Sequence, residues 1–135
     1  MSPSVPVKKE VLQRMLEEAR ATPTLECCGL LAGREGAISA IFPAANMLAS
    51  ATAYEIAPRE LFRIFREMRA AGLEHLGIYH SHPRGDNVPS ARDLEQAYYP
   101  DVAYFIVSPT PDAAQPVCAF TIREGRVAEL RIVEV

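Results

Sequence analysis

Two histidines separated by one residue give the strongest chemical signal in the sequence. His80 and His82 flank Ser81 and directly precede Pro83. In an extended segment, side chains two residues apart point to the same side, so both imidazoles can approach one point. Asp93 follows after a loop, in the first turn of a predicted helix, where its carboxylate can lean back. Two imidazoles and one carboxylate leave one tetrahedral position open for water, as in catalytic zinc sites.

A glutamate elsewhere in the chain is suited to moving protons beside such a metal. Glu26 directly precedes the apolar run 27–32, and a charge there is costly unless it has a role. Zinc lowers the pKa of its bound water to about 7, and a nearby carboxylate can take and return the proton. We therefore expect Glu26 to act as the general base. Ser90 could donate a hydrogen bond to the oxyanion of a tetrahedral intermediate.

Each of these residues also has a simpler explanation. Isolated histidines are commonly satisfied surface or core residues. The pattern from Ser90 to Asp93 is also that of a capping box, which needs no metal, although a capped helix would hold the aspartate still. Glu26 could simply end a loop in solvent. These explanations would all have to apply at once, so we favour the metal site.

The elements that position these residues are expected to be short, because eleven prolines and seven glycines interrupt the chain. Apolar spacing predicts helices over residues 7–20, from Pro58 to about Gly72, and from Ser90 to about Tyr98. Strands are predicted at 27–32, 37–42, 54–56, 76–79, 102–107, 117–122 and 127–133. The sequence thus predicts an α/β protein, a single domain over residues 1–135 with a mixed sheet of five to seven strands flanked by helices.

The composition excludes several classes of function. Hydrophobic residues make up 49% and charged residues 23% of the chain, which is typical of a globular domain and not of a disordered one. The net charge is −3 and no basic run occurs, which argues against nucleic-acid binding. No apolar stretch approaches the ~20 residues of a membrane span, and no signal peptide is visible. Three cysteines do not form an even disulfide framework, so we expect free thiols, a cytoplasmic location and no membrane association.

Other catalytic motifs fit the sequence less well. A nucleobase deaminase would show H-x-E and P-C-x-x-C, and the sequence contains no C-x-x-C. The helical H-E-x-x-H motif, the Walker loop, G-x-S-x-G and G-x-G-x-x-G are absent from it as well.

Three segments together resemble the signature of the JAMM (MPN-plus) metalloproteases. That signature is a glutamate before a C-G-L-L-x-G strand, then H-x-H-P, then S-x-x-D, and it matches residues 26–33, 80–83 and 90–93. The order of elements agrees from about residue 7 to the C-terminus. The resemblance implies a cytidine-deaminase-like α/β fold. It also implies zinc held by His80, His82 and Asp93, with Glu26 as general acid and base and Ser90 supporting the intermediate.

The resemblance also implies a type of substrate. Eukaryotic members of this family remove ubiquitin, and small prokaryotic members are associated with ubiquitin-like sulfur-carrier proteins that end in Gly-Gly. We therefore expect a peptidase that acts on the tail of such a carrier. Arg84, Asp86 and Asn87 could contact the tail, although turn chemistry alone explains Asp86 and Asn87. The alternatives are a non-catalytic interaction module, which the complete ligand set disfavours, and a zinc hydrolase of a small-molecule amide, which the sequence does not separate from a peptidase. The oligomeric state stays open.

The remaining polar and sulfur residues near the motifs are expected to be structural. Strand alternation would turn one of Cys27 and Cys28 toward the site and the other away, which leaves a fortuitous zinc ligand or a redox brake as alternatives. We favour two small buried apolar residues. His75 is expected to be an exposed turn residue and not a ligand.

Overall fold

The computed structural model describes residues 3–84, 87–110 and 113–135. The helices are α1 (Lys9–Ala21), α2 (Pro58–Ala70) and α3 (Ala91–Glu95). The strands are β1 (Ser4–Val7), β2 (Cys28–Arg34), β3 (Ala37–Ala44), β4 (Glu74–Ser81), β5 (Ala103–Val107), β6 (Val117–Arg123) and β7 (Arg126–Glu134). The predicted α/β class with a mixed sheet and flanking helices is confirmed.

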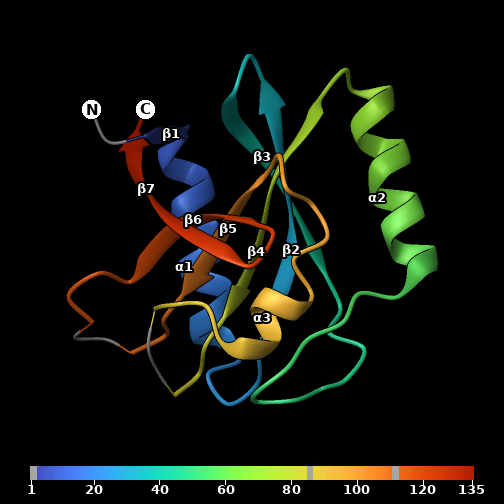
Figure 1. Ribbon diagram of the computed structural model, residues 1–135. Helices are drawn as coiled ribbons and strands as arrows, with labels where there is room; N and C mark the ends of the chain where they lie inside the picture. The colour runs from blue at the N-terminus through green and yellow to red at the C-terminus, as the bar shows by residue number, and fades with distance from the viewer. Residues whose placement is uncertain (1–2, 85–86, 111–112) are drawn as a thin grey trace.

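The strands form one mixed sheet that closes on itself in the order β1-β3-β2-β4-β5-β6-β7. Within this sheet β4 and β5 run parallel to each other, while β2 lies antiparallel to β4 (Figure 1). Closure depends on β1, which lies parallel to β7 from Ser4, opposite Arg131, to Val7, opposite Glu134. The sequence did not predict this strand. Its four residues carry too little pattern to be recognised before their pairing partner, far along the chain, is known.

Successive residues of each strand face opposite sides of the sheet and build two apolar layers. Residues Leu31, Tyr79 and Phe105 pack with Met15 of α1 on one side. Their neighbours Leu30, Ile78 and Tyr104 pack with Ile64 and Met68 of α2 on the other side (Figure 1). His80, two residues after Ile78 in β4, therefore faces the side that carries α2.

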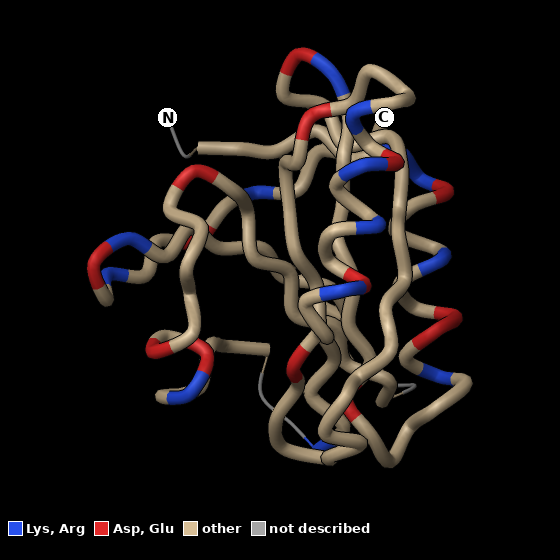
Figure 2. Tube along the Cα trace, turned by 90° about the vertical axis from the view of Figure 1, so that its right-hand side faces the viewer, with Lys and Arg blue, Asp and Glu red and all other residues tan. Residues whose placement is uncertain are grey.

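Most charged residues of the helices are exposed or half-buried. Figure 2 shows the positions of basic and acidic residues interspersed along the same helices and loops. Among the described residues no helix has both the length and the apolar character needed to cross a membrane.

Three local expectations were wrong. Residues 54–56 belong to no strand; Tyr54 and Ile56 pack into the α2 side of the core instead. The third helix ends at Glu95 and not near Tyr98. His75 is not an exposed turn residue, because β4 already begins at Glu74.

His75 occupies a half-buried place in β4. Its Nε2 lies 3.0 Å from the carbonyl oxygen of Gly77, and its ring meets the rings of Phe65 and Tyr99 edge to face. Burial lowers the pKa of His75. His75 therefore contributes to packing and is not part of the cluster that contains His80 and His82.

Candidate metal centre

Three side chains converge where β4 ends and α3 begins. His80 lies in β4, His82 directly follows that strand, and Asp93 lies in the first turn of α3. The two Nε2 atoms are 2.9 Å apart. Oδ1 of Asp93 lies 3.2 Å from Nε2 of His80, and Oδ2 lies 3.1 Å from Nε2 of His82. The potential ligand atoms all lie within 4.8 Å of one another.

Backbone hydrogen bonds explain this convergence. The N–H of His82 donates to the carbonyl of Val107 at 2.9 Å, which holds the chain against β5 beyond the end of β4. A capping box fixes Asp93: its N–H donates to Oγ of Ser90 at 3.1 Å, and its Oδ2 accepts from the N–H of Ser90 at 2.8 Å. The pattern from Ser90 to Asp93 is thus a capping box, and the same capping box holds Asp93 where it can bind a metal.

The donor set fits a tetrahedral cation. Zinc–nitrogen bonds of about 2.0–2.1 Å imply ligand atoms roughly 3.3 Å apart, close to the separations found here. His80 is buried, and burial lowers its pKa, which favours the neutral imidazole that binds metals. Burial opposes ionisation of Asp93, but hydrogen bonds from His80 and His82 outweigh it and hold the pKa of Asp93 well below its usual range. The carboxylate of Asp93 and the neutral imidazole of His80 are thus ready to bind a cation together with His82.

Glu26 is placed beside His82 by strand pairing. Cys28 lies opposite His80 in the antiparallel pair of β2 and β4. The N–H of Ser81 donates to the carbonyl of Cys27 at 3.0 Å and extends that pairing, so Glu26 falls opposite His82.

The environment of the Glu26 carboxyl group is that of a proton carrier. The residue is only 6% exposed, and burial raises the pKa of its carboxyl group to about 7. Among the described residues, none offers a hydrogen-bond partner to its Oε1. A buried carboxyl group with a free oxygen and a pKa near neutrality can both accept and release a proton.

A groove of about 230 Å³ joins Glu26, His82 and Ser90. Its other lining residues are Ala51, Thr52, Pro83 and Arg84. Of the loop residues expected to face a peptide, Arg84 therefore lines this groove. The side-chain amide of Asn87 instead donates to the carbonyl of Gln115, and Asp86 lies outside the described residues.

Sequence reasoning missed three residues of this site. Asn46 holds the loop after β3, with its amide donating to the carbonyls of Glu26 and Ala53 at 3.1 and 2.9 Å. Tyr54 stacks on the ring of His80. Oγ of Ser81 accepts from the N–H of Cys27 at 2.8 Å. Of these three, only Asn46 gave a signal in the sequence. An asparagine in a loop of small residues often forms hydrogen bonds with the nearby backbone.

The paired cysteines behave as small buried residues. Cys27 packs on the α1 side and Cys28 on the α2 side, as strand alternation predicts. Burial raises the pKa of Cys27 to about 11 and that of Cys28 to about 12, so neither is a ready thiolate. All three cysteines are free, and none joins the His–His–Asp cluster in the part of the chain that the structure describes.

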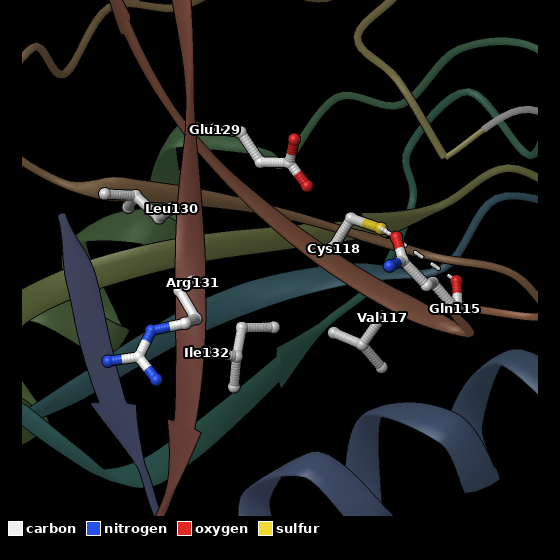
Figure 3. A pocket seen from close by; sticks show the side chains of 7 residues that line it. All are labelled: Gln115, Val117, Cys118, Glu129, Leu130, Arg131 and Ile132. Carbon is white, nitrogen blue, oxygen red and sulfur yellow. Dashed lines mark hydrogen bonds between the residues drawn. The ribbon is translucent and has the colours of Figure 1, made fainter. Parts of the chain in front are cut away.

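A larger hollow, of about 460 Å³, lies elsewhere, between β6 and β7 (Figure 3). Figure 3 shows Val117 and Ile132 pointing into it, with Cys118 contacting Gln115 at its rim. Its lining residues include only two potential metal-ligating side chains, Cys118 and Glu129, and not the three that form the His–His–Asp cluster. Volume alone therefore does not mark the reactive site.

The fold and the His–His–Asp cluster beside a buried glutamate define a metal-dependent hydrolase. A family model described as prokaryotic homologues of the JAB domain matches residues 8–123, and the chain belongs to that family. A desampylase of Haloferax volcanii is 38% identical over 81% of both chains. A CysO-cysteine peptidase of Mycobacterium tuberculosis is 30% identical over 91% of this chain and 86% of its own. The chain is accordingly a metallopeptidase of the JAMM type.

Solved structures agree with this assignment. The solution structure of a protein from Desulfitobacterium hafniense superposes with a TM-score of 0.87 at 32% identity, covering 97% of this chain and 92% of that one. A structure described as the JAMM metalloprotease-like zinc site of the proteasome and signalosome gives a TM-score of 0.63 at 21% identity, covering 97% and 99% of the two chains. The second likeness supports the fold alone.

Proposed function

We propose that this protein is a zinc-dependent peptidase that hydrolyses an amide or isopeptide bond at the C-terminal tail of a ubiquitin-like, sulfur-carrier type protein. The observation that carries the proposal is the convergence of His80, His82 and Asp93 beside the buried, unpartnered carboxyl oxygen of Glu26. The names of the relatives support the substrate class, because a desampylase and a CysO-cysteine peptidase are both named for small carrier proteins.

In this proposal the residues have separate roles. His80, His82 and Asp93 hold the zinc. Zinc bound there would supply a Lewis acid that activates water and polarises the scissile carbonyl. Glu26 takes a proton from the attacking water and returns it to the leaving amine, which suits a pKa of about 7. Ser90 accepts a hydrogen bond from the N–H of Asp93 through its Oγ, so its own O–H proton is left to donate to the oxyanion.

The groove beside Glu26 suits an extended tail with small residues. Ala51 and Thr52 form one part of its lining, Pro83 and Arg84 another. A Gly-Gly terminus has no side chains and could lie close to the backbone that lines this groove. Arg84 can bind a carbonyl or carboxylate of the bound peptide. The three free thiols favour a cytoplasmic location, which we include in the proposal.

The experiment is to incubate the zinc-loaded protein with ubiquitin-like carriers that bear a C-terminal adduct and to follow cleavage by mass spectrometry. We expect loss of the adduct after the terminal glycine, inhibition by a chelator, and recovery with added zinc. Glu26→Gln is the matched control, because it should keep zinc and abolish turnover. Full turnover by Glu26→Gln would remove Glu26 from the mechanism.

A second substrate set separates a peptidase from a small-molecule amidase. The same bond is offered in the folded carrier and in an isolated tail peptide. A strong preference for the folded carrier supports the proposal, while equal rates on the peptide and on small amides would contradict it. Absence of cleavage with zinc bound would favour a non-catalytic interaction module.

A further inference from the structure

An aromatic ring covers one face of the metal-ligand histidine. Tyr54, in the segment between β3 and α2, stacks on His80 with ring centroids 4.7 Å apart and planes inclined by 24°. This separation is within the range of favourable offset stacking between aromatic rings. The contact joins a residue of a loop to a residue of β4.

The other ring nitrogen of His80 has no comparable support. Its Nε2 faces His82 and Asp93, so binding a metal through Nε2 places the proton on Nδ1. Nδ1 is buried, and no group of residues 3–84, 87–110 and 113–135 accepts a hydrogen bond from it. Metal-bound histidines normally donate this N–H to a carboxylate or a carbonyl, which fixes the rotation of the ring. Something else must fix the rotation of His80.

The backbone on both sides of Tyr54 is anchored by one side chain. The amide of Asn46 donates to the carbonyl of Ala53 at 2.9 Å, and its Oδ1 accepts from the N–H of Glu55 at 3.2 Å. The same amide donates to the carbonyl of Glu26. The position of the Tyr54 ring is thus tied to the segment before β2 that carries the proposed base, Glu26.

We propose that Tyr54 is a positioning residue for the metal: its ring, and not a hydrogen bond, holds the imidazole of His80 in the orientation that binds the cation. The inference rests on the proposed zinc site. It requires the aromatic face of Tyr54 and not its hydroxyl group. Removing the ring would let the imidazole rotate about its Cβ–Cγ bond and would weaken one of three ligands.

Two variants separate the ring from the hydroxyl group. Tyr54→Phe keeps the stacking face, and Tyr54→Leu keeps apolar bulk without it. Tyr104→Leu is the control for stability, because Tyr104 is buried in the same layer of the core and lies in β5. Among the described residues, the rings that contact the His80 ring are those of Tyr54 and His82, and not that of Tyr104. Zinc affinity is measured by competition with a chromophoric chelator, and ligand geometry by the visible absorption of the cobalt(II) form.

We expect Tyr54→Leu to lose about 10- to 100-fold in zinc affinity, the range typical of residues that orient a ligand, and to change the cobalt spectrum. Tyr54→Phe should stay within about threefold of the parent protein in the same assay, in line with that mechanism. Tyr104→Leu should melt at a lower temperature yet keep both the zinc affinity and the spectrum.

Unchanged affinity and spectrum in Tyr54→Leu would overturn the inference, and so would an equal loss in Tyr54→Phe. If Tyr54→Leu does not fold, proton NMR of the parent protein decides. Nuclear Overhauser effects between the rings of Tyr54 and His80 must appear in both the metal-free and the zinc-loaded forms. Their absence from either form overturns the inference. Failure of the parent protein to bind zinc or cobalt would instead overturn the proposed function.

Discussion

Oγ of Ser81 accepts a hydrogen bond from the backbone N–H of Cys27 at 2.8 Å. This bond fastens the segment between Glu26 and β2 to the end of β4, at the residue between the two histidines. Ser81 is completely buried and points to the side of the sheet opposite His80. It is the residue in the H-x-H-P motif that faces away from the metal. Its contribution is to fix the distance between the base and the ligands.

Replacing Ser81 with alanine should therefore affect turnover more than metal binding. The change leaves the buried N–H of Cys27 without its acceptor, which costs about 1–3 kcal/mol of the free energy of unfolding. Because Glu26 is the residue before Cys27, we expect a lower kcat with zinc affinity changed only a few-fold. Urea denaturation, chelator competition and steady-state kinetics measure the three quantities.

Tyr104→Phe is the matched control for that variant. Its hydroxyl oxygen accepts from the backbone N–H of Tyr99 at 2.9 Å, so its loss also leaves a backbone donor without its acceptor, but on a different segment. A similar stability loss with unchanged kcat in Tyr104→Phe would assign the effect of Ser81→Ala to the position of Glu26. Equal loss of kcat in both variants would show that lowered stability alone explains it.

The sequence contained the local part of this site but not the part that depends on pairing. A period of two was enough to place the imidazoles of His80 and His82 on one side, and a capping pattern was enough to place Asp93 at a helix start. The register of β2 against β4, which sets Glu26 opposite His82, is not encoded in local spacing. The contact between Tyr54 and His80 could not be predicted for the same reason, because it forms only when the loop that carries Tyr54 folds back onto β4.

Removal of the metal should lower the stability of the protein by a predictable amount. Any ligand that binds only the folded state stabilises it according to its concentration relative to Kd, by about 2.7 kcal/mol at a hundredfold excess over Kd. We expect zinc to raise the melting temperature of the chelated protein, and magnesium to have no such effect because the site offers two nitrogen ligands. Thermal denaturation with each ion measures both effects.

His82→Ala tests whether that stabilisation comes from the cluster. The variant should lose the zinc-dependent rise in melting temperature together with the zinc content measured by elemental analysis. His75→Ala is the control, because His75 lies in β4, the strand that leads to His82, but contacts Phe65 and Tyr99. A zinc response that persists in His82→Ala would place the ion elsewhere.

Gly29, the glycine that follows Cys28 in β2, has a packing role that can be measured. A Cβ built on Gly29 would lie 2.5 Å from the ring of Tyr79 and 2.6 Å from the carbonyl oxygen of Phe42. Since the carbonyl belongs to the backbone of β3, it cannot move aside easily. We expect Gly29→Ala to lower the free energy of unfolding by about 1–3 kcal/mol. Gly77→Ala, whose Cβ would meet its neighbours at 3.2 Å, should cost less, and the reverse order in urea denaturation would contradict this explanation.

The two roles assigned to Ser90 can be separated by the choice of substitution. Ser90→Ala removes the helix cap and the hydroxyl donor together, so its effect on rate includes a displaced Asp93. Ser90→Gly removes the same hydroxyl group, but glycine at an N-cap costs only a few tenths of a kcal/mol. If the hydroxyl group stabilises the oxyanion, Ser90→Gly should keep its zinc affinity and KM and lose roughly 10²–10³ in kcat. If Ser90→Gly keeps both its zinc affinity and its kcat, the only role of Ser90 is to cap the helix. The oxyanion would then depend on the cation for its stabilisation.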